Sequence, residues 1–168
     1  MKPQDVVVLI KLFLLKDKKR TIALIAHSVF LSISETHAAI KRLILSGLYD
    51  SALQVPRKAA MEEFLVHAVK YIFPVEIGTE VRGISTAHSA SPLANKIRSS
   101  NKDMYVWPYE FGNKRGLSIT PLYPTVPQAV QNDSELYKIL ALIDALRIGR
   151  ARDRILAQNE IIKIIRTK

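Results

Sequence analysis

The stretch Leu31-Ser32-Ile33-Ser34-Glu35-Thr36-His37-Ala38-Ala39-Ile40-Lys41-Arg42-Leu43, followed by Ser46-Gly47-Leu48, decides the interpretation of this chain. The run Ser32-Ile33-Ser34-Glu35 has the form of a capping box, in which the side chains of Ser32 and Glu35 each satisfy the other residue's backbone N–H. Thr36, Ala39, Ile40, Leu43 and Ile44 then recur at the spacing of one helical face. Gly47 suits the left-handed conformation that ends a helix. The pattern predicts a helix within residues 32–47.

The opposite face of this predicted helix is polar, with small side chains near its start and a basic pair further along. Small donors and acceptors suit base edges in the major groove, and cations suit phosphate oxygens. We expect Ser34, His37 and Lys41 to read the groove. An ordinary helical hairpin with a solvated polar face is the alternative. The complete set of expected DNA contacts is Ser32, Ser34, Glu35, His37, Lys41, Arg42, Arg57, Lys58, Arg147, Arg150 and Arg154.

Two further helices are predicted before this one. Pro3 and Asp5 suit the start of a helix that is apolar nearly all round and therefore needs cover from a partner subunit or from the rest of the chain. A polar loop over residues 16–20 ends it. Thr21 suits the N-cap of a short helix that ends near Val29, and residues 30–32 form the turn. Three helices with a short turn between the second and third are typical of a helix-turn-helix.

The stretch from Pro3 to Leu48 resembles the winged helix-turn-helix of bacterial MarR-type regulators. The run of Leu31, Ser32, Ser34, Leu43, Gly47 and Leu48 is similar to the recognition helix of that family and its passage into the wing, and the resemblance covers about the first 60 residues. It implies a DNA-binding regulator. Residues 48–56 leave room for only a short wing, so we expect weak minor-groove contact. Arg57 and Lys58 follow the wing and are within reach of phosphates.

Charge is concentrated at the two ends of the chain. The 168 residues carry 25 Lys and Arg against 15 Asp and Glu, a net charge of +10. Residues 1–47 contribute +5, residues 48–146 contribute zero and residues 147–168 contribute +5. This distribution predicts a localised basic surface for a polyanionic partner. Because the chain has no cysteine, it has no disulfides, thiolate metal sites or cysteine nucleophiles.

The middle of the chain is the least informative part. Residues 57–73 are predicted to form a helix that Pro74 ends. Residues 74–133 hold six of the eight prolines, and here we expect a hairpin of residues 104–107 and 117–120 around a turn at 112–116. Three roles compete for this segment: an extended cover over the helices, a surface for a second protein, or an effector pocket.

The C-terminal part is predicted to form two helices, over residues 134–148 and 150–166, that Gly149 separates. Its arginines either bind phosphates or pair within the chain with Glu62, Glu63 or Glu76. The apolar positions of the second helix need cover, for which we expect the first helix of the same or the other subunit.

Catalysis and metal binding have little support. His88 lies beside several hydroxyl residues, but no nucleophile motif accompanies it. The four histidines lack the spacing of a metal site. We therefore expect no enzyme activity and no cofactor.

These patterns predict a mainly α fold with a small β component: a winged helix-turn-helix with a helical and irregular C-terminal extension. The expected parts are residues 1–73, a DNA-binding domain with a following helix; 74–133, a Pro/Gly-rich extended segment; and 134–168, helices for packing or dimerisation. We expect a cytoplasmic homodimer that binds double-stranded DNA as a transcriptional repressor, with no membrane partner. The alternative is an antitoxin or adaptor that binds a partner protein through residues 74–133 and regulates its own operon.

Overall fold

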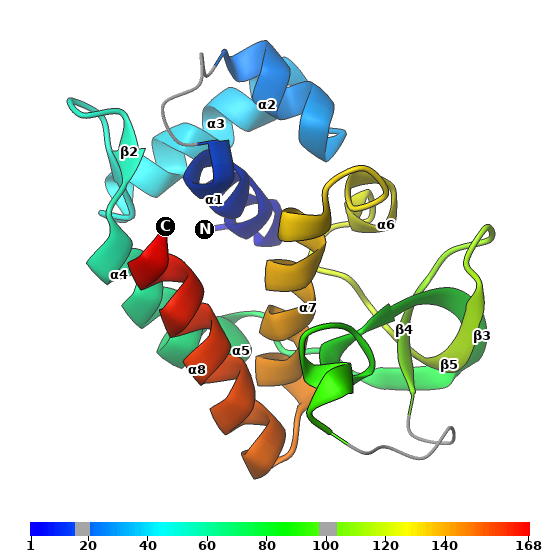
Figure 1. The fold of residues 1–168 in the computed structure, drawn as a ribbon. Coiled ribbons are helices and arrows are strands. Elements are labelled where there is room, and N and C mark those ends of the chain that lie inside the picture. Colours follow the sequence, from blue (N-terminus) through cyan, green and yellow to red (C-terminus); the bar gives the residue numbers. More distant parts are fainter. Residues whose placement is uncertain (16–20, 98–103) are drawn as a thin grey trace.

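The computed structural model describes residues 1–15, 21–97 and 104–168. They form a mostly helical molecule with a small β component, as the sequence predicts (Figure 1). In the described residues no single helix is long and apolar enough to cross a membrane. Two helices bent by 105°, Ile22–Val29 and Ile33–Leu45, pass that test only when taken together, by length and composition.

The first three helices are α1 (Pro3–Leu15), α2 (Ile22–Val29) and α3 (Ile33–Leu45). Their predicted caps are confirmed. Thr21 Oγ1 accepts a hydrogen bond from the Leu24 N–H at 3.1 Å, and Ser32 Oγ accepts one from the Glu35 N–H at 3.1 Å. Gly47 has a φ of +74°, which an L side chain rarely adopts. The predicted polar loop at 16–20 lies outside the described residues.

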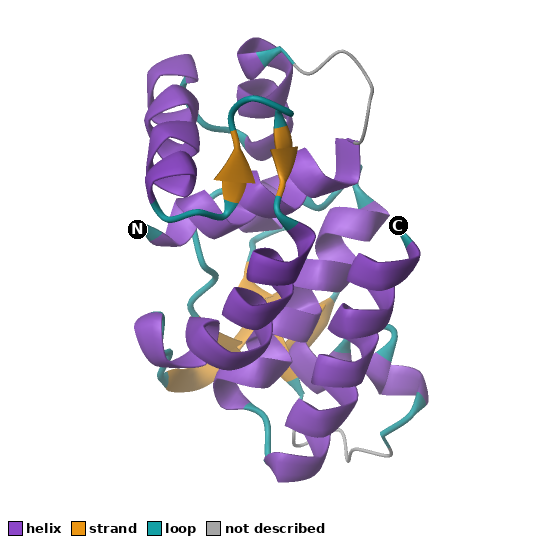
Figure 2. Ribbon diagram, turned by 90° about the vertical axis from the view of Figure 1, so that its left-hand side faces the viewer, coloured by secondary structure: helices purple, strands orange, loops and turns teal. Residues whose placement is uncertain are grey.

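Helix α1 lies at the centre of the molecule, between α2 and α3 on one side and α7 on the other (Figures 1 and 2). Its apolar residues are buried on every side: Val6, Val7, Val8, Leu9, Ile10, Leu12 and Phe13. The apolar side chains of α1 are therefore covered by other parts of the same chain, so their burial requires no partner subunit.

After α3 comes a hairpin of two short antiparallel strands, β1 (Tyr49–Asp50) and β2 (Val55–Pro56). A helical segment follows it as α4 (Lys58–Glu63), the π-helical turn η1 (Phe64–Ala68) and α5 (Val69–Ile72). The helix predicted over residues 57–73 is thus present, with one wide turn in its middle.

The structure corrects the prediction for the middle segment. Strand β3 (Ile77–Thr86) pairs antiparallel with both β4 (Tyr105–Pro108) and β5 (Lys114–Ile119). Strands β4 and β5 pair in parallel, with Tyr105 opposite Leu117, so the three strands close into a small barrel and do not form the predicted 104–120 hairpin. The segment also contains the 3₁₀ turns η2 (Ala87–Ser89) and η3 (Leu93–Asn95). It is therefore not an extended cover.

Glycines allow the barrel to close. A Cβ atom on Gly83 would lie 2.0 Å from the Trp107 carbonyl oxygen, and one on Gly112 would lie 2.2 Å from that of Gly83. Only a residue without a side chain fits where backbones approach so closely.

The remaining helices are α6 (Val126–Ala129), α7 (Ser134–Ile148) and α8 (Ala151–Thr167), and the predicted break at Gly149 is present. Helix α7 is joined to the barrel through Asp144, which is 1% exposed. Its carboxylate accepts hydrogen bonds from Thr86 Oγ1 at 2.9 Å and Trp107 Nε1 at 2.5 Å. Helix α8 packs mainly on α7 and α4, and not mainly on α1 as expected.

Candidate nucleic-acid interface

Helices α2 and α3 meet at 105° across a short turn. Phe30 begins this turn in the left-handed conformation, with φ 55°, and its backbone N–H donates to the carbonyl oxygens of Ala26 and His27. Ser32 ends the turn as the N-cap of α3. Two helices at about 90–120° joined by a short turn have the geometry of a helix-turn-helix pair.

Helix α3 presents a polar stripe to solvent. Ser34, His37 and Lys41 are exposed and lie at the i, i+3 and i+7 spacing of one helical face. Ser32 is exposed at the start of the helix, with its Oγ 3.1 Å from that of Ser34. Hydroxyl, imidazole and ammonium groups thus follow one another along the outside of α3, while Thr36, Ala39 and Leu43 are buried on its inside.

Two of the predicted contacts, Glu35 and Arg42, point instead toward α1. Arg42 donates from Nε to Asp5 Oδ2 at 2.9 Å and from Nη2 to Asp5 Oδ1 at 2.7 Å. Its Nη2 also donates to Glu35 Oε1 at 2.7 Å, and Gln4 Nε2 donates to the same oxygen at 3.0 Å. The Glu35 side chain therefore does not complete the capping box as expected, and Arg42 is engaged within the protein and not directed at a ligand.

The charges of this cluster reinforce one another. The hydrogen bond from Arg42 lowers the pKa of the Glu35 carboxyl below its ordinary value of 4.5. The hydrogen bond to Asp5 raises the pKa of Arg42 above its already high value, so the guanidinium is always charged. Asp5, at 0% exposed, is the partner of Arg42, and the sequence analysis did not predict this pairing. The sequence did hold a signal. Asp5 lies one residue before the buried apolar run of α1, and a carboxylate buried there needs a cation or hydrogen-bond donors.

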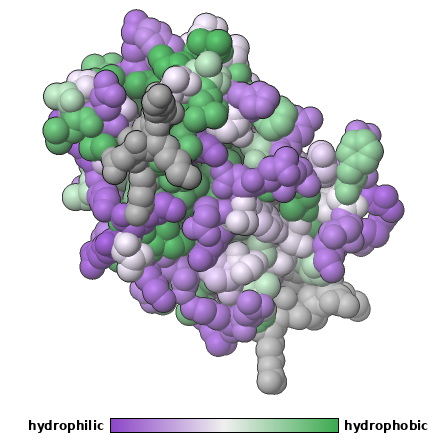
Figure 3. All heavy atoms as spheres, turned by 45° about the horizontal axis from the view of Figure 1, so that its top comes forward, coloured by the Kyte–Doolittle hydropathy of each residue, from purple (hydrophilic) through white to green (hydrophobic). Residues whose placement is uncertain are grey.

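Around α3 the face is mixed in polarity. Figure 3 shows apolar and hydrophilic groups interspersed over the upper part of the molecule, which carries α2 and α3. The exposed apolar side chains of these helices include Leu24, Phe30 and Ile33. Ile44, expected on the inner face of α3, is 38% exposed.

The hairpin beside α3 is stabilised by hydrogen bonds to the carboxylate of Asp50, which lies on its first strand. Asp50 Oδ1 accepts hydrogen bonds from the N–H groups of Ala52 and Leu53, each at 3.0 Å, and Asp50 Oδ2 accepts one from Arg57 Nη2 at 3.2 Å. The Leu53 N–H contributes most to lowering the pKa of the Asp50 carboxyl. The hairpin tip carries no cation, and its Leu53 side chain is 73% exposed.

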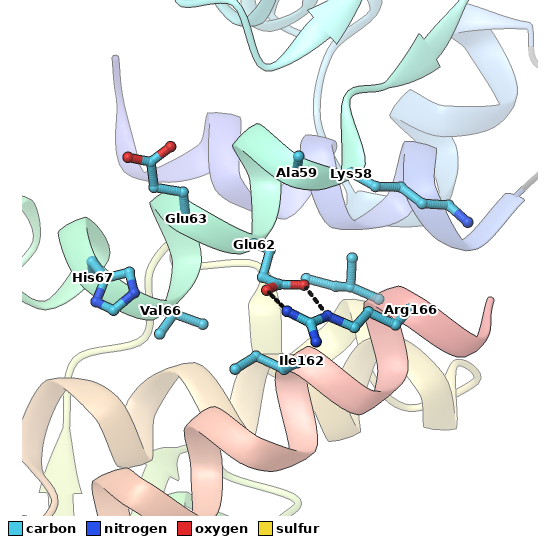
Figure 4. Close-up of a pocket in the computed structure, with 9 residues that line it drawn as sticks. Lys58, Ala59, Glu62, Glu63, Val66, His67, Ile162 and Arg166 are labelled. Carbon is cyan, nitrogen blue, oxygen red and sulfur yellow. Dashed lines mark hydrogen bonds and ion pairs between the residues drawn. The ribbon is translucent and has the colours of Figure 1, made fainter.

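Lys58 is exposed where α4 begins. It lines a cavity of about 420 Å³ between α4 and α8, together with Glu62 and Arg166. Figure 4 shows the Arg166 guanidinium directed at Glu62, with hydrogen bonds of 3.0 and 2.6 Å, and the Lys58 side chain extended away from that pair. Glu62 therefore pairs with an arginine within the chain, which was one of the two expectations. The partner is Arg166 and not an arginine of the 147–154 segment.

The predicted arginines of residues 147–154 do not join this face. The corner between α7 and α8 lies at the end of the molecule away from α2 and α3 (Figures 1 and 2). The Arg147 side chain is 4% exposed and donates to Asp144 Oδ1 at 2.7 Å and to the Phe73 carbonyl oxygen at 2.8 Å. Arg154 is half-buried and Arg150 is exposed as the N-cap of α8. The arginines of residues 147–154 thus do not share a surface with the exposed stripe of α3.

The residues considered for catalysis are used in packing. His88 is buried, its ring meets that of Tyr105 edge to face at 5.1 Å, and its Nδ1 lies 3.9 Å from Asp153 Oδ2. Ser89 Oγ accepts a hydrogen bond from the Tyr105 N–H at 3.0 Å. In the part of the chain that the structure describes, no three His, Asp or Glu side chains come together as a metal site.

Comparisons of the chain with family models, with curated proteins and with solved structures give no match.

Proposed function

We propose that residues 1–73 act as a winged helix-turn-helix that binds double-stranded DNA, with α3 in the major groove and the β1–β2 hairpin beside it. The observation that carries this proposal is the open polar stripe of Ser34, His37 and Lys41 on α3. A recognition helix needs such groups on its exposed face and rigid support on its buried face. The salt bridge from Arg42 to Asp5 supplies that support, because it joins α3 to α1, and the Arg42–Glu35 pair within α3 holds the guanidinium in place.

The roles of the side chains then follow from their place. Ser34 and His37 meet base edges near the start of α3, and Lys41 meets a base or a phosphate one turn later. Arg57 and Lys58 bind backbone phosphates beside the hairpin. A protein of this kind acts as a transcriptional repressor when its site overlaps a promoter. Its homodimer, which a two-fold operator requires, forms through a surface other than α1.

The test is binding of a fluorescent random-sequence duplex by the whole chain, measured by anisotropy at several salt concentrations. Replacing one phosphate-binding lysine flattens the slope of log K against log salt by about 0.9. We expect Lys58→Ala to show this change and Lys41→Ala to weaken binding. Lys163→Ala, an exposed lysine on α8, is the matched control. Equal effects of all three variants would overturn the proposal.

Footprinting on the region upstream of the protein's own gene then tests sequence specificity. We expect a protected site from which Ser34→Ala or His37→Ala removes sequence preference with a smaller loss of non-specific affinity. Protection that these variants leave unchanged would place base readout on another element.

A further inference from the structure

Beyond duplex binding by α3, we propose that the tip of the three-stranded barrel binds single-stranded nucleic acid. An unpaired base would stack on Phe111 and Tyr109, and the backbone phosphates would lie on Arg82 and Lys114. These residues come from β3, β5 and the turn between β4 and β5, which lie on the side of the molecule away from α8 (Figure 1).

The aromatic part of the tip is open to solvent. Phe111 is 76% exposed, and its ring centroid lies 5.7 Å from that of Tyr109 with the planes at 72°. Rings presented in this way offer a π-face to a base, and base–aromatic stacking does not depend on the base's identity.

The cations beside these rings have unsatisfied charge. Arg82 lies directly opposite Arg115 in the β3–β5 register, and like charges in that relation destabilise a strand pair. Glu80 Oε1 accepts a hydrogen bond from Arg115 Nε at 3.2 Å. Among the described residues, Arg82 and Lys114 then have no ion-pair partner. A phosphate bound at Arg82 would relieve its repulsion with Arg115. The Tyr109 N–H donates to the Arg82 carbonyl oxygen at 3.2 Å, which joins the backbone of the turn that carries the rings to the backbone of β3.

A cavity of about 580 Å³ adjoins the tip, and Tyr109, Phe111 and Lys114 are among the residues that line it. This volume lies in the range of small-ligand sites. Its described lining includes hydroxyl and amide groups but no carboxylate. Tyr137 donates its O–H to the Ser85 carbonyl oxygen at 2.7 Å, so its phenolic oxygen remains an acceptor for a donor on a base edge. A base in the cavity would thus contact polar groups. The backbone phosphates beside it would not be repelled by a carboxylate of the lining.

The chemistry favours an unpaired strand over a duplex. In a duplex the faces of the bases are covered by their stacked neighbours, so exposed rings reach them only after unstacking that costs a few kcal/mol. An unpaired base pays no such cost. Exposed rings with adjacent cations are the combination that proteins use to bind single strands.

The test is anisotropy of a labelled oligothymidylate of about 12 nucleotides with the whole chain. We expect Phe111→Ala to weaken binding about fivefold or more, and Lys114→Ala to flatten the salt slope by about 0.7. Tyr71→Ala is the matched aromatic control, because Tyr71 on α5 is also 76% exposed. Lys163→Ala is the matched control for charge.

Three results would overturn the proposal: no binding of the oligonucleotide, an equal loss with Tyr71→Ala, or a loss with Lys41→Ala that Phe111→Ala does not share. The last would assign single strands to the α3 face. Loss of a co-purifying protein from Phe111→Ala, without oligonucleotide binding by the original chain, would instead assign the tip to a protein partner. Duplex binding is measured separately on the same variants, so failure at the barrel tip leaves the role of α3 to be decided by Lys41→Ala and Lys58→Ala.

Discussion

Arg42 on α3 and Asp5 on α1 form a two-point salt bridge, with Nε to Oδ2 at 2.9 Å and Nη2 to Oδ1 at 2.7 Å. Asp5 is completely buried, and the Arg42 side chain is 25% exposed. The Asp5 carboxylate also accepts a hydrogen bond from the Lys2 N–H at 2.7 Å. The orientation of the exposed face of α3 is therefore fixed through a residue that lies 37 positions earlier in the chain.

The first prediction concerns this pair. Arg42→Ala leaves the Asp5 carboxylate buried without its cation, which costs about 3 kcal/mol of the free energy of unfolding. Lys41→Ala, its exposed neighbour, costs less than about 0.5 kcal/mol. Urea denaturation of both variants measures the difference. If Arg42→Ala unfolded at the same urea concentration as the original protein and lost only duplex affinity, Arg42 would be a phosphate ligand after all.

The second prediction is a dependence on pH. The pKa of Glu35 is lowered in the folded protein, chiefly by the hydrogen bond from Arg42, so below about pH 4.5 the unfolded chain binds more protons than the folded one. The stability that Glu35 supplies is present above that pH and is lost as the pH falls toward the lowered pKa. Glu35→Gln should therefore destabilise the protein at neutral pH, and the difference should shrink on acidification from about pH 5 to pH 3.

Urea denaturation across that pH range measures this difference. Glu110→Gln, which removes one exposed carboxylate on the barrel, is the matched control for charge. A difference between Glu35→Gln and the original protein that stayed constant with pH would mean that the carboxylate charge is not what stabilises the fold.

The local features of the fold could be predicted from the sequence because they depend on neighbouring residues. The caps Thr21 and Ser32, the stop at Gly47 and the break at Gly149 act within one helical turn. The partner of Arg42 could not be found in this way, because helix faces alone do not say which charged residue meets which across the fold.

The barrel escaped prediction for a related reason. Strand β3 contains Gly78, Thr79, Glu80, Arg82 and Gly83, and it lacks the regular apolar alternation of a half-buried strand. It is held instead by close backbone approach to β4 and β5, which glycine permits and hydropathy does not report. The parallel pairing of β4 with β5 was likewise hidden, because a short connection between two strands suggests a hairpin.

The third prediction separates the two arginines near Gly149. Arg147→Gln deprives the buried Asp144 of its cation and costs about 3 kcal/mol of the free energy of unfolding. Arg150→Ala removes an exposed charge and costs less than about 0.5 kcal/mol. Because both lie at the end of the molecule away from α3, neither change should alter the affinity for duplex DNA. A loss with Arg150→Ala as large as that with Lys41→Ala would show that the α7–α8 corner also contacts DNA.

The fourth prediction contrasts two glycines that are required for different reasons. A Cβ on Gly112 would lie 2.2 Å from the Gly83 carbonyl oxygen, a backbone atom that cannot move without β3. Gly112→Ala should lower the free energy of unfolding by about 3 kcal/mol, the upper end of the range for an overpacked core, and Gly112→Asn should lower it more. Gly47 has a φ of +74°, and a Cβ atom added to it would have nothing within 4 Å. A substitution there therefore lowers the free energy of unfolding only through backbone conformation. Gly47→Ala should cost about 1 kcal/mol and Gly47→Asn less, because Asn tolerates the left-handed region.

Thermal or urea denaturation of the four variants therefore gives opposite orders of stability at the two positions. The Asn variant is more stable than the Ala variant at Gly47, and the Ala variant is more stable than the Asn variant at Gly112. The same order at both positions would contradict the close packing of the barrel, since only a steric limit penalises the larger side chain. The barrel variants should also lose the near-ultraviolet circular dichroism of Trp107, because its indole Nε1 reaches Asp144 only when β4 is held in place by that packing.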